Sequence, residues 1–140
     1  MANGDNPCIP YFDGGGDISA VAEAAVLGRR FVAVSDPQDG SSPAMGLDST
    51  ASGGRIKVSH AAAAAKPLGV ASYDASIGAP LYVVRGHKVV DVRVGATGVN
   101  AGVEVEVGAN GTAIPLASGK AVGVALDNIA NGSDGPIALY

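Results

Sequence analysis

The chain has 140 residues, a net charge of −4 and 47% hydrophobic residues, of which few are aromatic (4% of the chain). Charged residues make up only 16%, while there are 21 glycines and 8 prolines. Its valine content argues against disorder, its glycines against a coiled coil, and their irregular spacing against collagen. The acidic balance predicts no nucleic-acid partner, and no apolar run is long enough for a membrane span. We therefore expect one small, mostly β domain.

Residues 1–17 have a composition that is unsuited to a hydrophobic core. Glycine, asparagine, aspartate and proline dominate, and the start has neither the basic residues nor the apolar stretch of a secretion signal. The lone Cys8 leaves no internal disulfide, so we expect synthesis and folding in a cytoplasm. One apolar cluster stands out and consists of Ile9, Pro10, Tyr11 and Phe12. We interpret residues 1–17 as an extended arm whose cluster contacts either its own domain or a neighbouring protein.

Residues 18–54 contain one ambiguous segment, one strand and one long loop. Residues 18–27 fit a helix and a strand equally well, because alanine satisfies both patterns. Residues 30–35 are rich in β-branched side chains and predict a strand. Residues 36–54 are rich in serine, glycine and proline, and we interpret them as a long loop. Loops of this length inside a compact domain are usually functional or disordered, so this one is a candidate contact element.

Residues 55–140 alternate short β-type segments with turn residues. The segments span 55–59, 81–84, 89–94, 103–107, 113–116, 121–125 and 136–140. Residues 61–65 are all alanine, but this run is too short to form a helix by itself. Residues 85–88 predict a hairpin between their flanking strands, and Asn110-Gly111 predicts a type I′ turn. Together these features predict an all-β fold for residues 18–140, as a single small β-barrel or β-sandwich domain.

The chain contains one internal similarity. Residues 66–71 (KPLGVA) match residues 120–125 (KAVGVA), and Gly78 then corresponds to Gly132 at the same offset. We interpret residues 66–84 and 120–140 as copies of one unit. Two copies are too few for a solenoid but suit the pseudo-symmetric halves of a barrel or sandwich. The alternative is chance recurrence in a chain that is rich in glycine, valine and alanine.

Groups suited to catalysis or metal binding are sparse. His60 ends a strand and His87 lies in a turn, and no zinc-type spacing or nucleophile motif is present. The glycine-rich run at 13–17 lacks the Lys-Ser/Thr of a phosphate-binding loop. Oxygen ligands that could suit calcium occur without the spacing of a calcium-binding loop, at Asp13, Asp17, Asp127, Asn128 and Asp134. We therefore predict a protein that is not an enzyme and that uses no metal or cofactor.

Several stretches of the chain carry a family resemblance. They are GDIS and GRRFVAVS within residues 16–35, GGRIKV at 53–58, LGVASYDA and GAPLYVVRG within 68–86, and AGVEVEVG, AVGVAL and GPIALY within 101–140. Together they resemble the small capsid decoration proteins of tailed phages, of the type found in phages of actinobacteria. The resemblance covers most of the chain from about residue 9.

This resemblance implies a β-barrel or β-sandwich that attaches, often as a homotrimer, to the outside of an icosahedral phage head. It implies that the protein cements the expanded head without catalysis, with the major capsid protein as partner and the virion exterior as location. We expect the contacts to come from the loop at 36–54 and from Ile9, Pro10, Tyr11 and Phe12. Two alternatives stay open: a trimeric tail or fibre module that binds a host receptor, and a small sugar-binding barrel.

Overall fold

The computed structural model describes residues 17–37 and 56–140. Every strand in these ranges is short, and the one helical element is a 3₁₀ turn, η2 (Ala109–Gly111). The all-β prediction is therefore confirmed, and each β-type segment that we expected contains a strand. The predicted arm up to residue 16 and the predicted loop from residue 38 lie outside the described residues, while Asp36 belongs to a strand.

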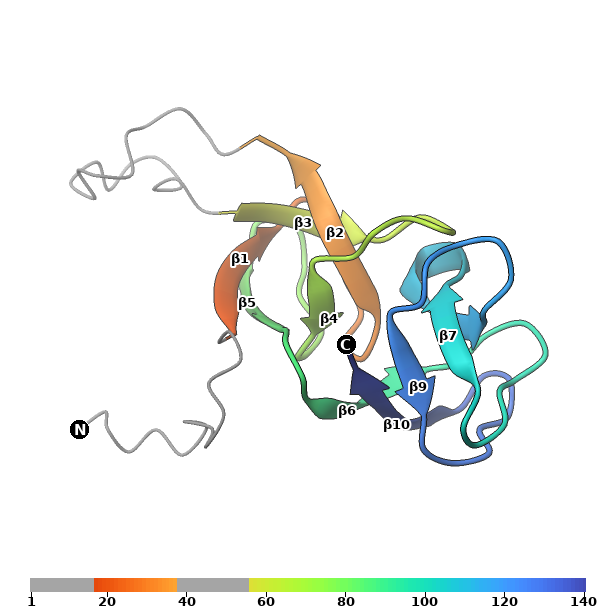
Figure 1. The fold of residues 1–140 in the computed structure, drawn as a ribbon. Coiled ribbons are helices and arrows are strands. Elements are labelled where there is room, and N and C mark those ends of the chain that lie inside the picture. The colour runs from red at the N-terminus through yellow and green to blue at the C-terminus, as the bar shows by residue number, and fades with distance from the viewer. Residues whose placement is uncertain (1–16, 38–55) are drawn as a thin grey trace, which may run out of the picture.

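The first half of the described chain is a closed five-stranded barrel in the order β1-β3-β2-β4-β5 (Figure 1). Its strands are β1 (Ile18–Ala22), β2 (Phe31–Asp36), β3 (Ile56–His60), β4 (Gly69–Ala71) and β5 (Pro80–Val84). β1 pairs in parallel with β3 and antiparallel with β5, which closes the ring. Small side chains such as Ala20, Val32 and Val58 are fully buried, because the interior of so narrow a barrel has room for little more.

The second half is a five-stranded sheet in the order β6-β10-β9-β7-β8, beside the first half in Figure 1. Its strands are β6 (Val89–Arg93), β7 (Glu104–Val107), β8 (Ala113–Pro115), β9 (Gly123–Ala125) and β10 (Asp134–Leu139). A parallel bridge between Val94 and Ala113 joins the end of β6 to β8. This bridge connects the two edges of the sheet at one point, so the second half follows the same circular strand order as the first.

The two halves are copies of one topology, with β1–β5 corresponding in chain order to β6–β10. Every strand pairing of the barrel has a counterpart with the same direction in the second sheet. The isolated bridge between Val26 and Ala75 is likewise matched by the bridge between Val99 and Ile129. The segments 66–84 and 120–140 hold the equivalent pairs β4–β5 and β9–β10.

Turn hydrogen bonds repeat between the halves as well. The N–H of Gly28 donates to Oδ1 of Asp74 at 2.8 Å, and the N–H of Ala101 donates to Oδ1 of Asn128 at 2.9 Å. In each half the next N–H along the chain then bonds to the carbonyl that ends β4 or β9. The halves differ most in the connection after β2 and β7, which spans residues 37–55 in the first half and 108–112 in the second.

The predicted hairpin around residues 85–88 is wrong. β5 pairs with β1 and β4, whereas β6 pairs with β10, so these residues link the two halves instead. Gly86 has a φ of +82°, and its carbonyl accepts the N–H of Lys88 at 2.7 Å, which turns the chain out of the barrel. Local turn signals do not distinguish such a link from a hairpin, because the partner of a strand depends on distant residues.

Two further sequence features are resolved by the fold. The ambiguous segment 18–27 contains the strand β1, since closure of the barrel requires a partner for β3 and β5. Asn110 and Gly111 have φ values of 56° and 74°. Positive φ at both central residues is what the predicted type I′ turn requires.

The buried side chains form two clusters, broadly one for each half. The cluster of the second half also includes Phe31, Ala61 and Val70, which come from the first half. Phe31, at the start of β2, is 1% exposed and is among the largest fully buried side chains. The two halves therefore share apolar contacts at their junction.

Candidate functional site

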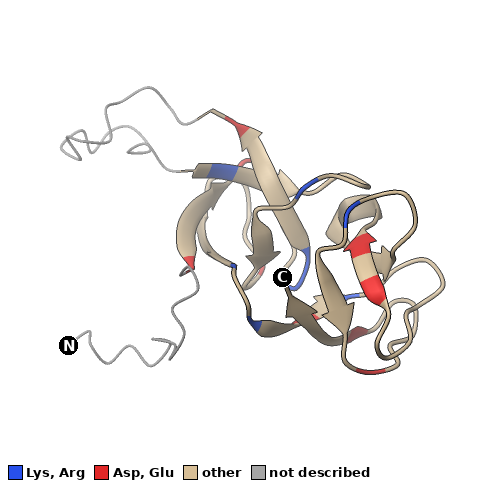
Figure 2. Ribbon diagram, in the orientation of Figure 1, with Lys and Arg blue, Asp and Glu red and all other residues tan. Residues whose placement is uncertain are grey.

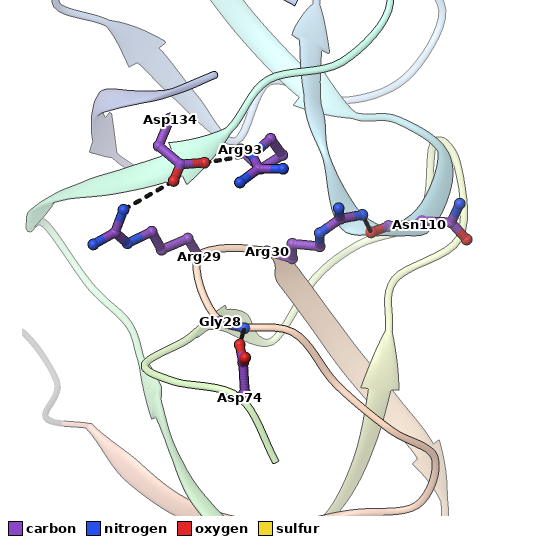
Figure 3. Close-up of polar contacts among 7 residues, drawn as sticks. All are labelled: Gly28, Arg29, Arg30, Asp74, Arg93, Asn110 and Asp134. Carbon is purple, nitrogen blue, oxygen red and sulfur yellow. Dashed lines mark hydrogen bonds and ion pairs between the residues drawn. The ribbon is translucent and has the colours of Figure 1, made fainter. Parts of the chain in front are cut away.

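Charged side chains of both halves meet in an ion-pair network at the junction (Figure 3). Asp134 of β10 accepts from Nε of Arg93 at 2.5 Å and from Nη1 of Arg29 at 2.8 Å. The hydrogen bond from Arg93, and then the one from Arg29, hold the pKa of Asp134 below its ordinary value, although burial opposes this shift. The charged carboxylate thus holds the turn that carries Arg29 in the first half against β6 and β10 of the second half.

The same turn carries two more polar contacts, which Figure 3 also shows. Nη1 of Arg30 donates to the carbonyl of Asn110 at 3.2 Å, again across the junction. Asp74 accepts the N–H of Gly28 at 2.8 Å within the first half. Arg29 and Arg30 are adjacent in the chain, and the fold directs their side chains to different partners.

A groove of about 670 Å³ runs along this network, and we call it the arginine groove. Arg29, Arg30 and Arg93 line it together with the half-exposed side chains of Leu27 and Tyr73. Arginine and tyrosine are enriched in protein–protein interfaces, where they supply much of the binding energy. The groove thus displays residue types that protein–protein interfaces favour.

Two tyrosines that are separated in the sequence are brought together beside this groove. Tyr73 and Tyr82 contact each other edge to face, with ring centroids 6.3 Å apart, and both are exposed. Ser72, which follows β4, donates from its Oγ to the carbonyl of Tyr82 in β5 at 2.9 Å. The sequence analysis did not pair these tyrosines, so the exposed aromatic pair is a feature that it missed.

A second cavity of about 210 Å³ lies where the two halves meet, and we call it the junction pocket. It is lined by equivalent residues of both halves, including Lys66 with Lys120, Leu68 with Val122, and Gly86 with Tyr140. Arg85 and Leu139 occupy a further equivalent pair of positions in its wall. The matched lysines of the internal repeat were the sequence signal for this pocket.

Two contacts position the wall of the junction pocket. Glu106 of β7 is 3% exposed, and its carboxylate accepts the N–H groups of Ala117 and Gly119, which holds the loop that leads to Lys120. The hydroxyl of Tyr140 donates to Oε2 of Glu104 at 2.6 Å, and this hydrogen bond raises the pKa of Tyr140. Figure 2 shows these two acidic positions on β7, whereas Lys and Arg lie mainly in connections and at strand ends.

The capsid contacts expected from the sequence, Ile9, Pro10, Tyr11 and Phe12, lie outside the described residues. The other candidates are accounted for locally. His87 is exposed in the link between the halves. Asp127 accepts the N–H of Asn128, whose own side chain accepts from Ala101, while Asp134 pairs with arginines.

Within the described ranges, no cluster of three or more His, Cys, Asp or Glu side chains is placed to hold a metal ion. No helix in these ranges has the length and hydropathy to cross a membrane.

His60 is a structural acceptor at the end of β3. Its Nε2 accepts the N–H of Leu27 at 2.9 Å, which requires that nitrogen to be unprotonated. Burial, and next the positive charge of Arg30, lower the pKa of His60 below its ordinary value of 6.5. The neutral imidazole is therefore part of the folded structure.

We expect acid to weaken the fold through His60. A folded-state pKa below the unfolded value means that the unfolded chain binds the proton first as the pH falls. The contribution of His60 to the free energy of unfolding is therefore complete above the unfolded pKa, and it is lost as the pH drops through the folded pKa. Urea unfolding should show a loss of about 0.5–1 kcal/mol between pH of about 7.5 and about 5, limited by partial solvent screening. His60→Gln keeps an acceptor without this titration and should flatten that part of the profile. Parallel profiles for the two proteins would contradict this assignment.

Comparisons with known proteins include a likeness to a solved structure. No family model matches the chain, and no curated protein matches it. Among solved structures, the chain is similar to the head fiber gp8.5 N base of bacteriophage phi29, with a TM-score of 0.68 and 23% identity. The match covers 89% of this chain and 92% of that one. The two proteins therefore share a fold over nearly their whole lengths.

Proposed function

We propose that the chain is a structural protein of a phage virion, bound to the outside of the head as a decoration protein. The observation that carries the proposal is the fold that it shares with the phi29 head fiber base over 89% of its length. The sequence resemblance to capsid decoration proteins is an expectation that points to the same location. Both likenesses are to proteins of phage heads, and neither is to an enzyme.

In this proposal each subunit, as part of a homotrimer, contacts the major capsid protein and bridges neighbouring capsomers. The apolar cluster of Ile9, Pro10, Tyr11 and Phe12 supplies one contact, and the arginine groove suits a second because of its arginine and tyrosine side chains. A subunit that binds only the expanded lattice stabilises that lattice by linkage. Contacts from several subunits of one oligomer add avidity to weak single contacts.

A second candidate is the base of a fibre. The similar protein is itself described as a head fiber base, and 92% of it is matched by this chain. In that case the domain would still attach to the head, but it would carry a longer appendage instead of cementing capsomers. The sugar-binding alternative has only the exposed pair Tyr73 and Tyr82 in its favour.

Immunogold microscopy tests the location directly. Virions of the phage that encodes the chain are purified on a density gradient and labelled with antibody against the purified protein. We expect gold over the heads, with preimmune serum as control, and a copy number by quantitative mass spectrometry that follows the capsomer lattice. Gold on the heads together with only a few copies of the protein per virion would favour a fibre base. Gold on the tails would favour a receptor-binding module. Virions that lack the protein would overturn the proposal.

A further inference from the structure

The lysine and arginine side chains of the described residues divide into two groups. Most have a partner: Arg29 and Arg93 pair with Asp134, Lys88 with Asp17, Lys57 with Asp36, and Arg30 with the carbonyl of Asn110. The others are Lys66, Arg85 and Lys120, which have no ion pair within the ranges 17–37 and 56–140. All three of these line the junction pocket. In a protein with a net charge of −4, one pocket thus gathers three cations that make no ion pair within these ranges, although the carboxylates of Glu104 and Glu106 support its wall.

The inside of the junction pocket is apolar and small. Leu68, Val122 and Leu139 line it together with the cationic side chains. Its volume of about 210 Å³ is below the ~300–1,000 Å³ of pockets that hold drug-sized ligands. The pocket therefore suits one or two apolar side chains that are followed by a carboxylate.

The chain itself contains such a segment. Residues 9–13 read Ile-Pro-Tyr-Phe-Asp, an apolar cluster directly followed by an acidic residue. The described chain begins at Asp17, whose Oδ1 lies 2.5 Å from Nζ of Lys88. Lys88 adjoins the pocket, since its carbonyl accepts the N–H of Leu139 at 2.8 Å. An extended chain covers about 16 Å in five residues, so Phe12 is within reach of the pocket from this anchor point.

We propose that residues 9–13 dock in the junction pocket of their own chain when the protein is free in solution. The aromatic side chains occupy the apolar interior, and Asp13 faces Lys66, Arg85 and Lys120. The proposal goes beyond the proposed function, because it concerns the isolated protein and does not depend on where the protein sits in a virion. If the same side chains also bind capsid, the docked arm competes with that contact.

A single-tryptophan reporter tests the docking. The chain has no tryptophan, so Phe12→Trp introduces one fluorophore into the full-length protein. We expect blue-shifted emission and protection from acrylamide quenching, both of which weaken as salt screens the charges. Lys66→Gln with Lys120→Gln should lower the docked-to-free ratio roughly fourfold, at about a factor of two for each exposed ion pair. The matched control is Lys57→Gln, compared with Lys66→Gln alone. It removes one positive charge from β3, away from the pocket lining, and should leave the emission unchanged.

The outcomes separate the alternatives. Circular dichroism and thermal melting verify that each variant is folded, which the exposed positions of Lys66 and Lys120 favour. Docking within one chain is supported if the tryptophan emission is blue-shifted at every protein concentration. The shift must also be lost in the Lys66→Gln, Lys120→Gln variant and kept in the control variant. A shift that disappears on dilution would instead assign the pocket to the arm of a second copy and overturn docking within one chain. If the tryptophan is solvent-exposed even with the pocket lysines intact, or is equally buried after they are replaced, the junction pocket is not the docking site.

Discussion

We expect Gly111→Ala to destabilise the folded protein by about 3–4 kcal/mol, because the substitution affects both the turn and the junction of the halves. Gly111 has a φ of +74°, a conformation that costs an L-residue about 1–2 kcal/mol. An added Cβ would also collide with the carbonyl oxygen of Phe31 in the other half. That oxygen belongs to the backbone, so relief requires the loop after β7 to move away from β2. Urea unfolding at neutral pH measures the effect.

Gly132→Ala is the matched control for this prediction. Gly132 has a φ of +83°, but a Cβ at this position would meet no atom within 4 Å. Only the backbone strain then remains, so we expect a loss of about 1–2 kcal/mol. Equal losses for the two variants would mean that the close approach of Gly111 to Phe31 does not contribute to the junction.

We expect deletion of residues 1–12 to abolish binding to phage heads while the β fold stays intact. The described core contains no residue of the deleted segment, so the melting transition of the truncated protein should remain cooperative. The loss follows if the apolar cluster supplies the anchor on the major capsid protein, since a few buried apolar and aromatic side chains usually carry most of the energy of an interface. Co-sedimentation with heads that lack the protein measures occupancy.

Deletion of residues 1–6 is the control, because it shortens the chain and keeps Ile9, Pro10, Tyr11 and Phe12. This variant should occupy the heads like the full chain. If the longer deletion also decorates heads at full occupancy, the arm is not the anchor, and the arginine groove becomes the first surface to substitute. This experiment measures binding to heads, whereas the tryptophan reporter measures the arm of the free protein, so a failure of one proposal can be told from a failure of the other.

Much of the local structure could be predicted from the sequence, because it depends on residues that are close in the chain. Valine-rich segments between glycines predicted the strands, and Asn110-Gly111 predicted a turn with positive φ, which few other residue pairs adopt at low cost. The recurrence of KPLGVA as KAVGVA pointed to two related units, and the equivalent strands β4 and β9 lie in those segments.

The choice of partners, by contrast, was decided only by the tertiary structure. Residues 85–88 have the composition of a hairpin turn, yet they link two halves, because β5 completes one ring and β6 pairs with the last strand of the chain. The candidate site depends on the same long-range choices. Asp134 meets Arg29, which lies far from it in the sequence, and Tyr73 meets Tyr82 only through the pairing of the strands.

The sequence by itself thus determined the fold class and most strand segments, through local propensity and composition, and it suggested two related units with chance recurrence as the alternative. Only the tertiary structure decided that these units face each other across a junction. It also decided that the lysines of the repeat, Lys66 and Lys120, line one pocket. The physical reason is that burial, charge pairing and cavity shape arise between segments that are remote in the chain, where no local pattern of residues records them.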